Sequence, residues 1–357
     1  MNSPHIPIFV VGSARSGTTL MQKILRDKGG LAIAPETHYF DDLRPRIADP
    51  TARLADAERK NVEDYFLALS HREYGFYGDP DQSKVGRDLL RARAEELGGS
   101  ADAYFEAHCR IDFLGDDLTY ESIWGEKTPR HVFRIMEMAK AYPDSRFIFM
   151  LRDPRAVVCS YANWKKKHDG PSDASVSKDL AEAVALDTER VRNSYHPVVA
   201  TMIWRAAVSS ALRAREELGD DRVRILQYEE LCASTDDVLK DLWKWLGVEK
   251  VDEDAGIALI NSSFGATTQG AGMKQDAVFR WKTALSRGIQ RKVSRVAGKT
   301  LVRSGYESES SILDLVFLPF DYLSAIPTVY SAVAANRSRF GNPIMYVARR
   351  ARHMISG

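Results

Sequence analysis

The chain has 357 residues, of which 44% are hydrophobic and 28% charged, a composition that excludes disorder as a description of the whole. Its formal net charge of +1 excludes a general nucleic-acid binder, which would be strongly basic, so any anion site must be local. Three cysteines, Cys109, Cys159 and Cys232, are too few for a disulfide framework, and the apolar run 6–11 is too short for a secretory signal. We therefore expect a cytoplasmic, enzyme-sized protein that binds no nucleic acid.

The chain opens with a strand, a glycine loop and a helix. Ile6–Val11 is fully apolar and rich in β-branched residues, which is typical of a buried parallel strand. Gly12–Gly17 follows as a turn. Thr18–Lys28 then has apolar side chains at helical spacing, and Gly29-Gly30 ends the helix.

The same alternation of strand and helix recurs along the chain. Further strands are predicted at 31–35, 122–125, 146–151 and 223–227, and helices at 155–166 and 236–246. This order indicates an α/β fold with a parallel sheet flanked by helices. Residues 41–120 and 169–219 have helical patterns, and we interpret 41–120 as a helical insertion that shapes an acceptor site.

Residues 311–357 differ from the rest and form a predicted C-terminal helical extension. Asp321 is the only charge between Leu315 and Asn336, and the basic residues that follow are all arginines, with no acid among them. One interpretation places this segment on an anionic membrane surface, which would make the protein membrane-associated. The other packs it over the acceptor cleft or into a homodimer contact. Pro319, Pro327 and Asp321 interrupt any long amphipathic face, which favours packing over binding to a membrane surface.

The first glycine loop indicates a phosphate site. Gly12-x-x-x-x-Gly17-Thr18-Thr19 has the spacing of a nucleotide-phosphate loop, with Thr18 in the place of the usual lysine. A strand, a glycine loop and a helix N-terminus together bind anions through free backbone N–H groups. Arg15 is the available cation, so we expect a ligand less charged than a triphosphate and no metal. The alternative is a turn that only packs strand against helix. On the first reading, residues 1–310 form a P-loop-type domain.

Several motifs together resemble the sulfotransferases that use 3′-phosphoadenosine-5′-phosphosulfate (PAPS). Arg15-Ser-Gly-Thr-Thr19 resembles the 5′-phosphosulfate loop of the branch that includes bacterial and tyrosylprotein sulfotransferases, with arginine where cytosolic members have lysine. Arg152 at a strand end with Ser160 eight positions later resembles the 3′-phosphate motif. Further matches follow in the family's order at 35–38, 126–129, 227–231, 279–282 and 305–307, so the resemblance covers residues 6–307.

The resemblance implies PAPS as the sulfuryl donor and a set of residues that bind it. These are Arg15, Ser16, Gly17, Thr18 and Thr19 at the 5′-phosphosulfate, Arg152, Ser160 and Arg280 at the 3′-phosphate, and Tyr228 along the nucleotide. Independently, Arg152 ends a predicted parallel strand, where open α/β sheets bind ligands and a guanidinium can hold a phosphate in bidentate fashion. The alternative for Arg152 is an ion pair with Asp153, and Arg155 is expected to be solvated. Residues 261–275 have the composition of a closing lid.

Three residues are candidates for the chemical step. Glu36 follows the second predicted strand, where partial desolvation would raise its pKa toward neutrality, and the family branch places its proposed base there. His38 would lie on the same strand face and is the second candidate base, or else it only orients an acceptor. Lys127 would donate to the bridging oxygen, with Arg15 sharing the charge, unless Lys127 only forms an ion pair with Glu126 or Glu121.

The expected reaction moves a sulfuryl group from PAPS to a hydroxyl of a small-molecule, carbohydrate or lipid acceptor and releases adenosine 3′,5′-bisphosphate. A degenerate P-loop kinase that uses ATP and Mg²⁺ is the alternative enzyme, with Asp153 as its metal ligand. A nucleotide-binding scaffold without catalysis is the third hypothesis. The presence of both Glu36 and Lys127 argues against the scaffold.

Overall fold

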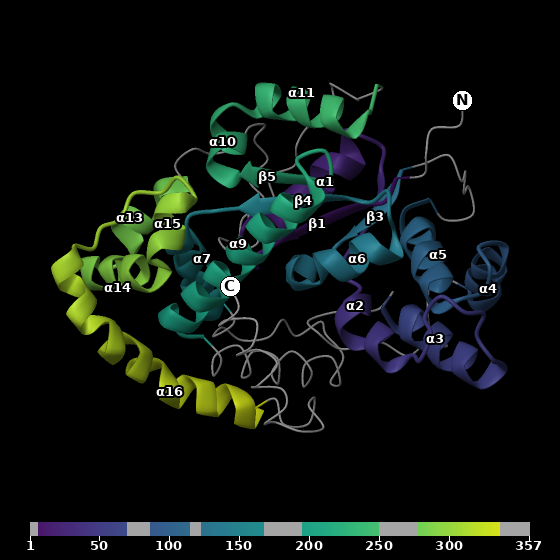
Figure 1. Ribbon diagram of the computed structural model, residues 1–357, viewed down its shortest axis with the longest axis horizontal. Coiled ribbons are helices and arrows are strands. Elements are labelled where there is room, and N and C mark those ends of the chain that lie inside the picture. Colours follow the sequence, from purple (N-terminus) through teal and green to yellow (C-terminus); the bar gives the residue numbers. More distant parts are fainter. Residues whose placement is uncertain (1–5, 70–85, 115–122, 168–194, 250–277, 336–357) are drawn as a thin grey trace.

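A computed structural model describes residues 6–69, 86–114, 123–167, 195–249 and 278–335. Within these residues, parallel strands form one sheet in the order β2-β3-β1-β4-β5 (Figure 1). The strands are β1 (Ile8–Gly12), β2 (Ala32–Ala34), β3 (Trp124–Lys127), β4 (Arg146–Leu151) and β5 (Val223–Gln227). The predicted parallel α/β fold is confirmed. One strand is shifted: β3 ends two residues later than predicted, so Lys127 is its last residue and does not follow it.

Helices cover both faces of the sheet because its strands are buried and apolar on both sides. Along β1, Ile8 and Val10 join one apolar cluster, while Phe9 and Val11 join the other. The first cluster packs against α1 (Thr18–Asp27), α10 (Tyr228–Ala233) and α11 (Thr235–Leu246), which lie above the sheet in Figure 1. The second packs against α5 (Ala101–Leu114), α6 (Ile135–Ala141) and α9 (Pro197–Leu218).

The described part of segment 41–120 is helical, as predicted. It contains η1 (Arg44–Arg46), α3 (Asp56–Leu69), α4 (Arg87–Glu96) and α5, preceded by α2 (Tyr39–Asp42). Glu63 of α3 is fully buried and binds Arg91 at 2.8 Å, with the Tyr104 hydroxyl donating to it at 3.0 Å. Because Tyr104 and Phe105 of α5 belong to the same apolar cluster as β1, this segment completes the main core.

The remaining helices are η3 (Pro129–Arg134), α7 (Pro154–Lys167), α13 (Trp281–Ala284), α14 (Arg287–Ala297), α15 (Lys299–Arg303), η4 (Ile312–Phe317) and α16 (Leu318–Ala335). The expectation that prolines break the C-terminal apolar run was wrong, because α16 continues through Pro327. Proline removes only its own backbone donor, and the turns on either side maintain the helix. Ile312–Ala334 is long and apolar enough to cross a membrane by length and composition alone.

Candidate functional site

The predicted site residues gather where the parallel strands end. β1 lies between β3 and β4. The connection after β1 runs toward β2 and the connection after β4 runs toward β5, on opposite sides of the sheet. Open α/β sheets bind ligands at the strand ends where the connections diverge in this way. β1 leads into the glycine loop, β4 into Arg152, β3 ends at Lys127, and β5 leads into Tyr228. Glu36 follows β2 by two residues. The site therefore draws on every strand of the described sheet.

At two positions of the glycine loop, neighbouring groups leave no room for a side chain. A Cβ at Gly12 would lie 2.8 Å from the Met150 carbonyl oxygen, and one at Gly17 would lie 2.5 Å from the Tyr228 ring. Gly17 also has φ 95°, in the region that favours glycine. Among the described residues, no acceptor contacts the backbone N–H groups of Gly17, Thr18 or Thr19. These donors are therefore available to a ligand at the N-terminus of α1.

Arg152 is held next to this loop by contacts that leave part of its guanidinium available. Its Cζ lies 4.2 Å from the centre of the Tyr228 ring, and its Nη1 donates to the Arg15 carbonyl oxygen at 3.1 Å. Its Nε is buried and has no hydrogen-bond partner among the residues that the structure describes. A buried donor without a partner is costly, so this atom fits an anionic ligand.

The predicted alternative, an ion pair between Arg152 and Asp153, was wrong. Asp153 instead pairs with Arg155 at 2.7 Å and accepts from its backbone N–H at 2.8 Å. Arg155 is buried, with its Cζ 4.0 Å from the centre of the Trp281 ring, so the expectation of a solvated Arg155 was also wrong. Asp153, the metal ligand that the kinase alternative requires, is thus already paired with Arg155.

Arg15 and Ser160 join the glycine loop to α7. The Arg15 Nε donates to the Ser160 hydroxyl at 3.2 Å, although the two residues are far apart in sequence. Burial lowers the pKa of Arg15, and Arg152 nearby lowers it further, while Tyr161 and Glu36 raise it. Arg15, Gly17–Thr19, Arg152 and Ser160 form what we call the anion cradle. A phosphate bound beside these two guanidinium groups would be stabilised by both.

The other predicted donor-site residues are Ser16 and Tyr228, which adjoin the cradle, and Arg280, for which only the neighbouring helix is established. The Ser16 hydroxyl is buried and without a partner among the described residues, and Thr18 is buried while Thr19 is exposed. Burial raises the pKa of Tyr228 to about 12, so its phenol is neutral at physiological pH. Arg280 directly precedes α13, which packs against α7. The predicted lid, residues 261–275, lies outside the described residues.

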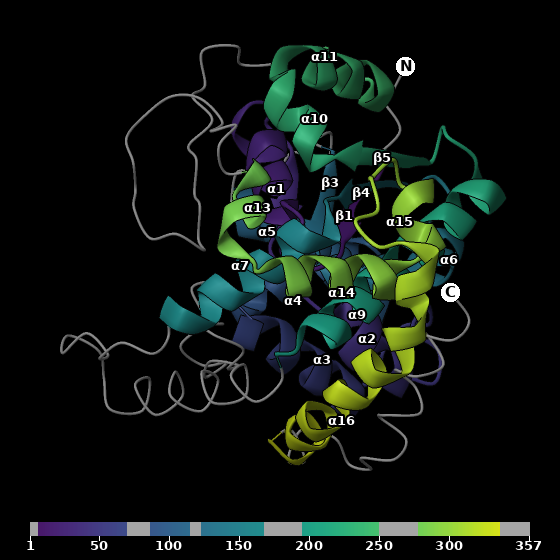
Figure 2. The same cartoon turned by 90° about the vertical axis from the view of Figure 1, so that its left-hand side faces the viewer.

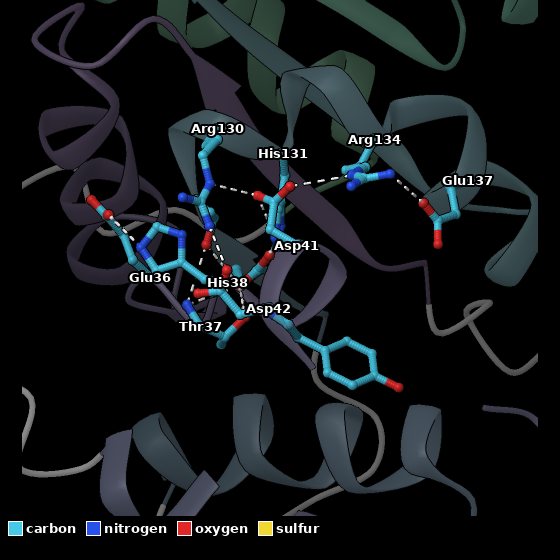
Figure 3. A network of polar contacts seen from close by, with 12 residues as sticks. Glu36, Thr37, His38, Asp41, Asp42, Arg130, His131, Arg134 and Glu137 are labelled. Atoms are coloured by element: carbon cyan, nitrogen blue, oxygen red, sulfur yellow. Dashed lines mark hydrogen bonds and ion pairs between the residues drawn. The ribbon is translucent and has the colours of Figure 1, made fainter. Parts of the chain in front are cut away.

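Glu36, His38 and Lys127 form a second group, the acid–base cluster. The Glu36 Oε1 lies 2.7 Å from the Lys127 Nζ, and its Oε2 lies 3.3 Å from the His38 Nε2. Figure 3 shows the His38 ring pointing toward Glu36. The side chain of Glu36 is 39% exposed, against 6% for Lys127 and 11% for His38. Glu36 is therefore the member of this cluster that can meet a second substrate.

Two expectations about this cluster were wrong. Burial alone would raise the pKa of Glu36, but Lys127 and His38 hold it well below its usual range. The cause is the sheet order, which places β2 beside β3 and so brings Lys127 to Glu36. His38 does not continue the strand: β2 ends at Ala34, and His38 has φ 56° immediately before α2.

A buried network that the sequence analysis did not identify includes Thr37 and His131, both labelled in Figure 3. Glu126 is fully buried on β3 and forms an ion pair with His131. It accepts hydrogen bonds from the Thr37 hydroxyl, from the Thr37 backbone N–H at 3.2 Å and from the Thr128 hydroxyl at 3.0 Å. Thr37 lies between Glu36 and His38, so this network fixes the backbone that carries both. Strand alternation was the available signal: Glu126 must face away from Lys127.

Ion pairs on the far side of His38 hold α2 in place. Asp41 of α2 accepts from Arg130 at 2.7 Å and from Arg134 at 3.2 Å, both on η3 (Figure 3). Burial would raise the pKa of Asp41, but Arg130, His131 and Arg134 lower it overall. The left-handed backbone at His38 is therefore fixed from both ends. Within the described residues, no group of three or more His, Cys, Asp or Glu side chains is placed to bind a metal.

The sequence of this chain is similar to those of known proteins. The sequence pattern of the sulfotransferase family matches residues 7–253. Two relatives, from Mycobacterium bovis and Mycobacterium tuberculosis, are named omega-hydroxy-beta-dihydromenaquinone-9 sulfotransferase Stf3; each is 23% identical over 266 residues, which cover 68% of this chain. The match spans 63% of the length of those relatives.

Two sulfotransferases are among the solved structures that align with this chain. The sulfotransferase domain from the curacin biosynthetic pathway aligns with a TM-score of 0.49 and 17% identity over 85% of this chain and 98% of that domain. A sulfotransferase from Alicyclobacillus acidocaldarius aligns with a TM-score of 0.44 and 18% identity over 84% of this chain and 94% of its own.

Proposed function

The chain belongs to the sulfotransferase family, and from this premise we propose that it transfers a sulfuryl group from PAPS to an alcohol, releasing adenosine 3′,5′-bisphosphate. The observation that carries the proposal is the position of the acid–base cluster next to the anion cradle. β1 pairs with β3, and Lys127 is in register with Val10, two residues before the glycine loop begins at Gly12. An anion bound in the cradle would therefore lie beside a carboxylate and a lysine.

The anion cradle supplies donors for both ends of the nucleotide. The N–H groups of Gly17–Thr19 and the side chain of Arg15 suit the 5′-phosphosulfate, because they converge at the positive end of α1. Arg152 and Ser160 suit the 3′-phosphate, with Arg280 as a further cation. The unpartnered Arg152 Nε supports this assignment. Tyr228 contributes by packing against Gly17 and Arg152, which fixes both.

The acid–base cluster has the groups that sulfuryl transfer requires. The acceptor oxygen forms a bond to sulfur while the bond from sulfur to the bridging oxygen of PAPS breaks, and the bonding electrons leave with the 5′-phosphate. Glu36 takes the proton of the acceptor hydroxyl, and the Lys127 ammonium stabilises the charge that develops on the bridging oxygen. His38 holds the second oxygen of Glu36, and Glu126 positions the Thr37 backbone.

Lys127 also makes donor binding precede activation of the acceptor. While it pairs with Glu36, that carboxylate is a weak base because its pKa is low. When Lys127 turns to the bridging oxygen of bound donor, Glu36 loses part of this stabilisation and its pKa rises. The carboxylate thus becomes a better base only after the donor is in place. The same step couples donor binding to acceptor activation.

The acceptor is an alcohol of a small molecule, a saccharide or a lipid. The two mycobacterial relatives are named for action on an omega-hydroxylated dihydromenaquinone, so a lipid alcohol is the first acceptor class to test. Cytoplasmic location and a homodimer stay predictions.

The direct experiment is a screen with radiolabelled PAPS and a panel of phenols, sugars, sterols and polyprenyl alcohols. We expect label to pass to at least one hydroxyl compound in the presence of EDTA, and Glu36→Gln to abolish the transfer. A parallel screen with labelled ATP and Mg²⁺ tests the kinase alternative. Phosphorylation of an acceptor, with no sulfation of any, would overturn the proposal.

A further inference from the structure

The C-terminal helix α16 points its large apolar side chains away from the protein. Its inward positions repeat every three or four residues and include Leu318, Tyr322 and Ala325. The large apolar side chains on the other side, and in η4 before it, are exposed: Ile312, Leu313, Leu315, Val316, Phe317, Phe320, Leu323, Ile326, Val329 and Tyr330. Figure 1 shows α16 along the outer edge of the molecule. A helix packed on a water-soluble domain normally has the reverse pattern.

An ion pair fixes this orientation. Asp321 is buried, and its carboxylate accepts from the Arg295 Nε at 2.8 Å and lies 3.7 Å from the Lys292 Nζ, both on α14. Rotating α16 to bury its apolar face would expose Ala325, which packs against Val198 and Val296, and would break this buried ion pair. To cross a membrane, the helix would have to leave α14 and carry Asp321 into hydrocarbon. The contacts therefore favour a helix that lies along a surface.

The helices that precede η4, namely α13, α14 and α15, carry exposed cations. Every charged residue of segment 278–306 is basic. Lys282, Arg287, Arg291, Lys299 and Arg303 are exposed. Figure 2 shows α14 running up to α16, and the Arg295 Cζ lies 5.7 Å from the centre of the exposed Phe317 ring. Basic side chains of α14 thus lie beside η4 and α16, and we call the exposed faces of α14, η4 and α16 together the α14–α16 surface.

We propose that the α14–α16 surface docks on an anionic lipid membrane. The apolar side chains of α16 enter the region between headgroups and acyl chains, and the exposed cations of α14 contact the headgroup phosphates. A second copy of the chain would fit less well, because the same cations would repel each other across the interface. This inference goes beyond sulfuryl transfer and does not depend on it.

The test is co-sedimentation of the full chain with vesicles of phosphatidylcholine alone or mixed with phosphatidylglycerol. We expect strong binding only to the mixed vesicles, weakening as salt increases. Phe320→Ser should lower the partition coefficient at least about tenfold, from the apolar contact it loses. Arg291→Gln should lower it about fivefold, the equivalent of one headgroup contact. Both residues are exposed, so thermal melts should match those of the unaltered protein.

Matched controls come from other parts of the surface. Met136→Ser removes an exposed apolar side chain on α6, and Lys240→Gln removes an exposed cation on α11; both should bind vesicles like the unaltered protein. Equal binding to neutral and anionic vesicles, or normal binding by Phe320→Ser and Arg291→Gln, would overturn the proposal. So would a dimer in sedimentation velocity that Phe320→Ser dissociates while vesicle binding stays unchanged. The readout is independent of sulfation, so either inference can fail without the other.

Discussion

The anion cradle and the acid–base cluster meet in one site but balance charge in opposite ways. In the cradle, Arg15 donates to the Ser160 hydroxyl, Arg152 contacts a backbone carbonyl and the Tyr228 ring, and Asp153 pairs with Arg155. In the cluster, Glu36 contacts both Lys127 and His38. The cradle is therefore preorganised for an anion that comes from outside, whereas the cluster carries its own counterions and must rearrange to act. The following variants test that contrast, in order of expected effect.

Glu36→Gln should have the largest effect. We expect turnover to fall about a thousandfold, because general-base catalysis contributes about 10²–10⁴-fold, while binding of adenosine 3′,5′-bisphosphate stays within about twofold. Turnover assays and calorimetry on the same preparation separate the two. His38→Asn is the companion variant and should lose much less, since His38 is nearly buried. Near-normal turnover in Glu36→Gln would move the base to His38.

Arg152→Ala should weaken bisphosphate binding about 10–100-fold, the range for hydrogen bonds to a charged group. Arg152→Lys is the matched control: it keeps the charge but not the planar fork, so affinity should be only partly restored. Calorimetry gives both constants. If Arg152→Ala binds the bisphosphate normally, Arg152 contributes nothing to the cradle.

Lys127→Gln should change how activity depends on pH. Removing the ammonium raises the pKa of Glu36, so the acidic limb of kcat/KM should move up by about 1–3 pH units. Turnover should also fall at every pH, because the bridging oxygen loses its donor. Lys127→Arg keeps the charge and should leave the limb near its original place. If the acidic limb of the kcat/KM profile does not move in Lys127→Gln, Lys127 does not control the pKa of Glu36.

Glu126→Gln should have the smallest effect on turnover, several-fold at most, because Glu126 acts through the Thr37 backbone. Stability is the sharper readout. Burial raises the pKa of Glu126, but His131 and the hydroxyl donors lower it overall, so ionised Glu126 stabilises the fold above its unfolded pKa. The difference in melting temperature between the two proteins should thus shrink as pH falls below about 4.3. A pH-independent difference would rule out this contribution.

The cradle was largely predictable from sequence because its signals are local. Gly12 and Gly17 have a fixed spacing within one strand–loop–helix unit, and Arg152 directly follows its strand. The charge state of Glu36 was not predictable, because its partner Lys127 comes from a strand 91 residues away that only the sheet order brings alongside. Strand alternation could have placed Glu126 opposite Lys127, but its contacts with Thr37 depend on the same sheet order. The continuity of α16 was not predicted, because a single proline such as Pro327 removes one backbone donor and need not end a helix.

The central claim is that the cradle binds a nucleotide bisphosphate with arginine and backbone donors and without a metal. Calorimetric titration of the full chain with adenosine 3′,5′-bisphosphate, once in EDTA and once in Mg²⁺, tests it most directly. We predict saturable one-to-one binding with the same affinity under both conditions. Absence of binding, or binding only when Mg²⁺ is present, would contradict the account.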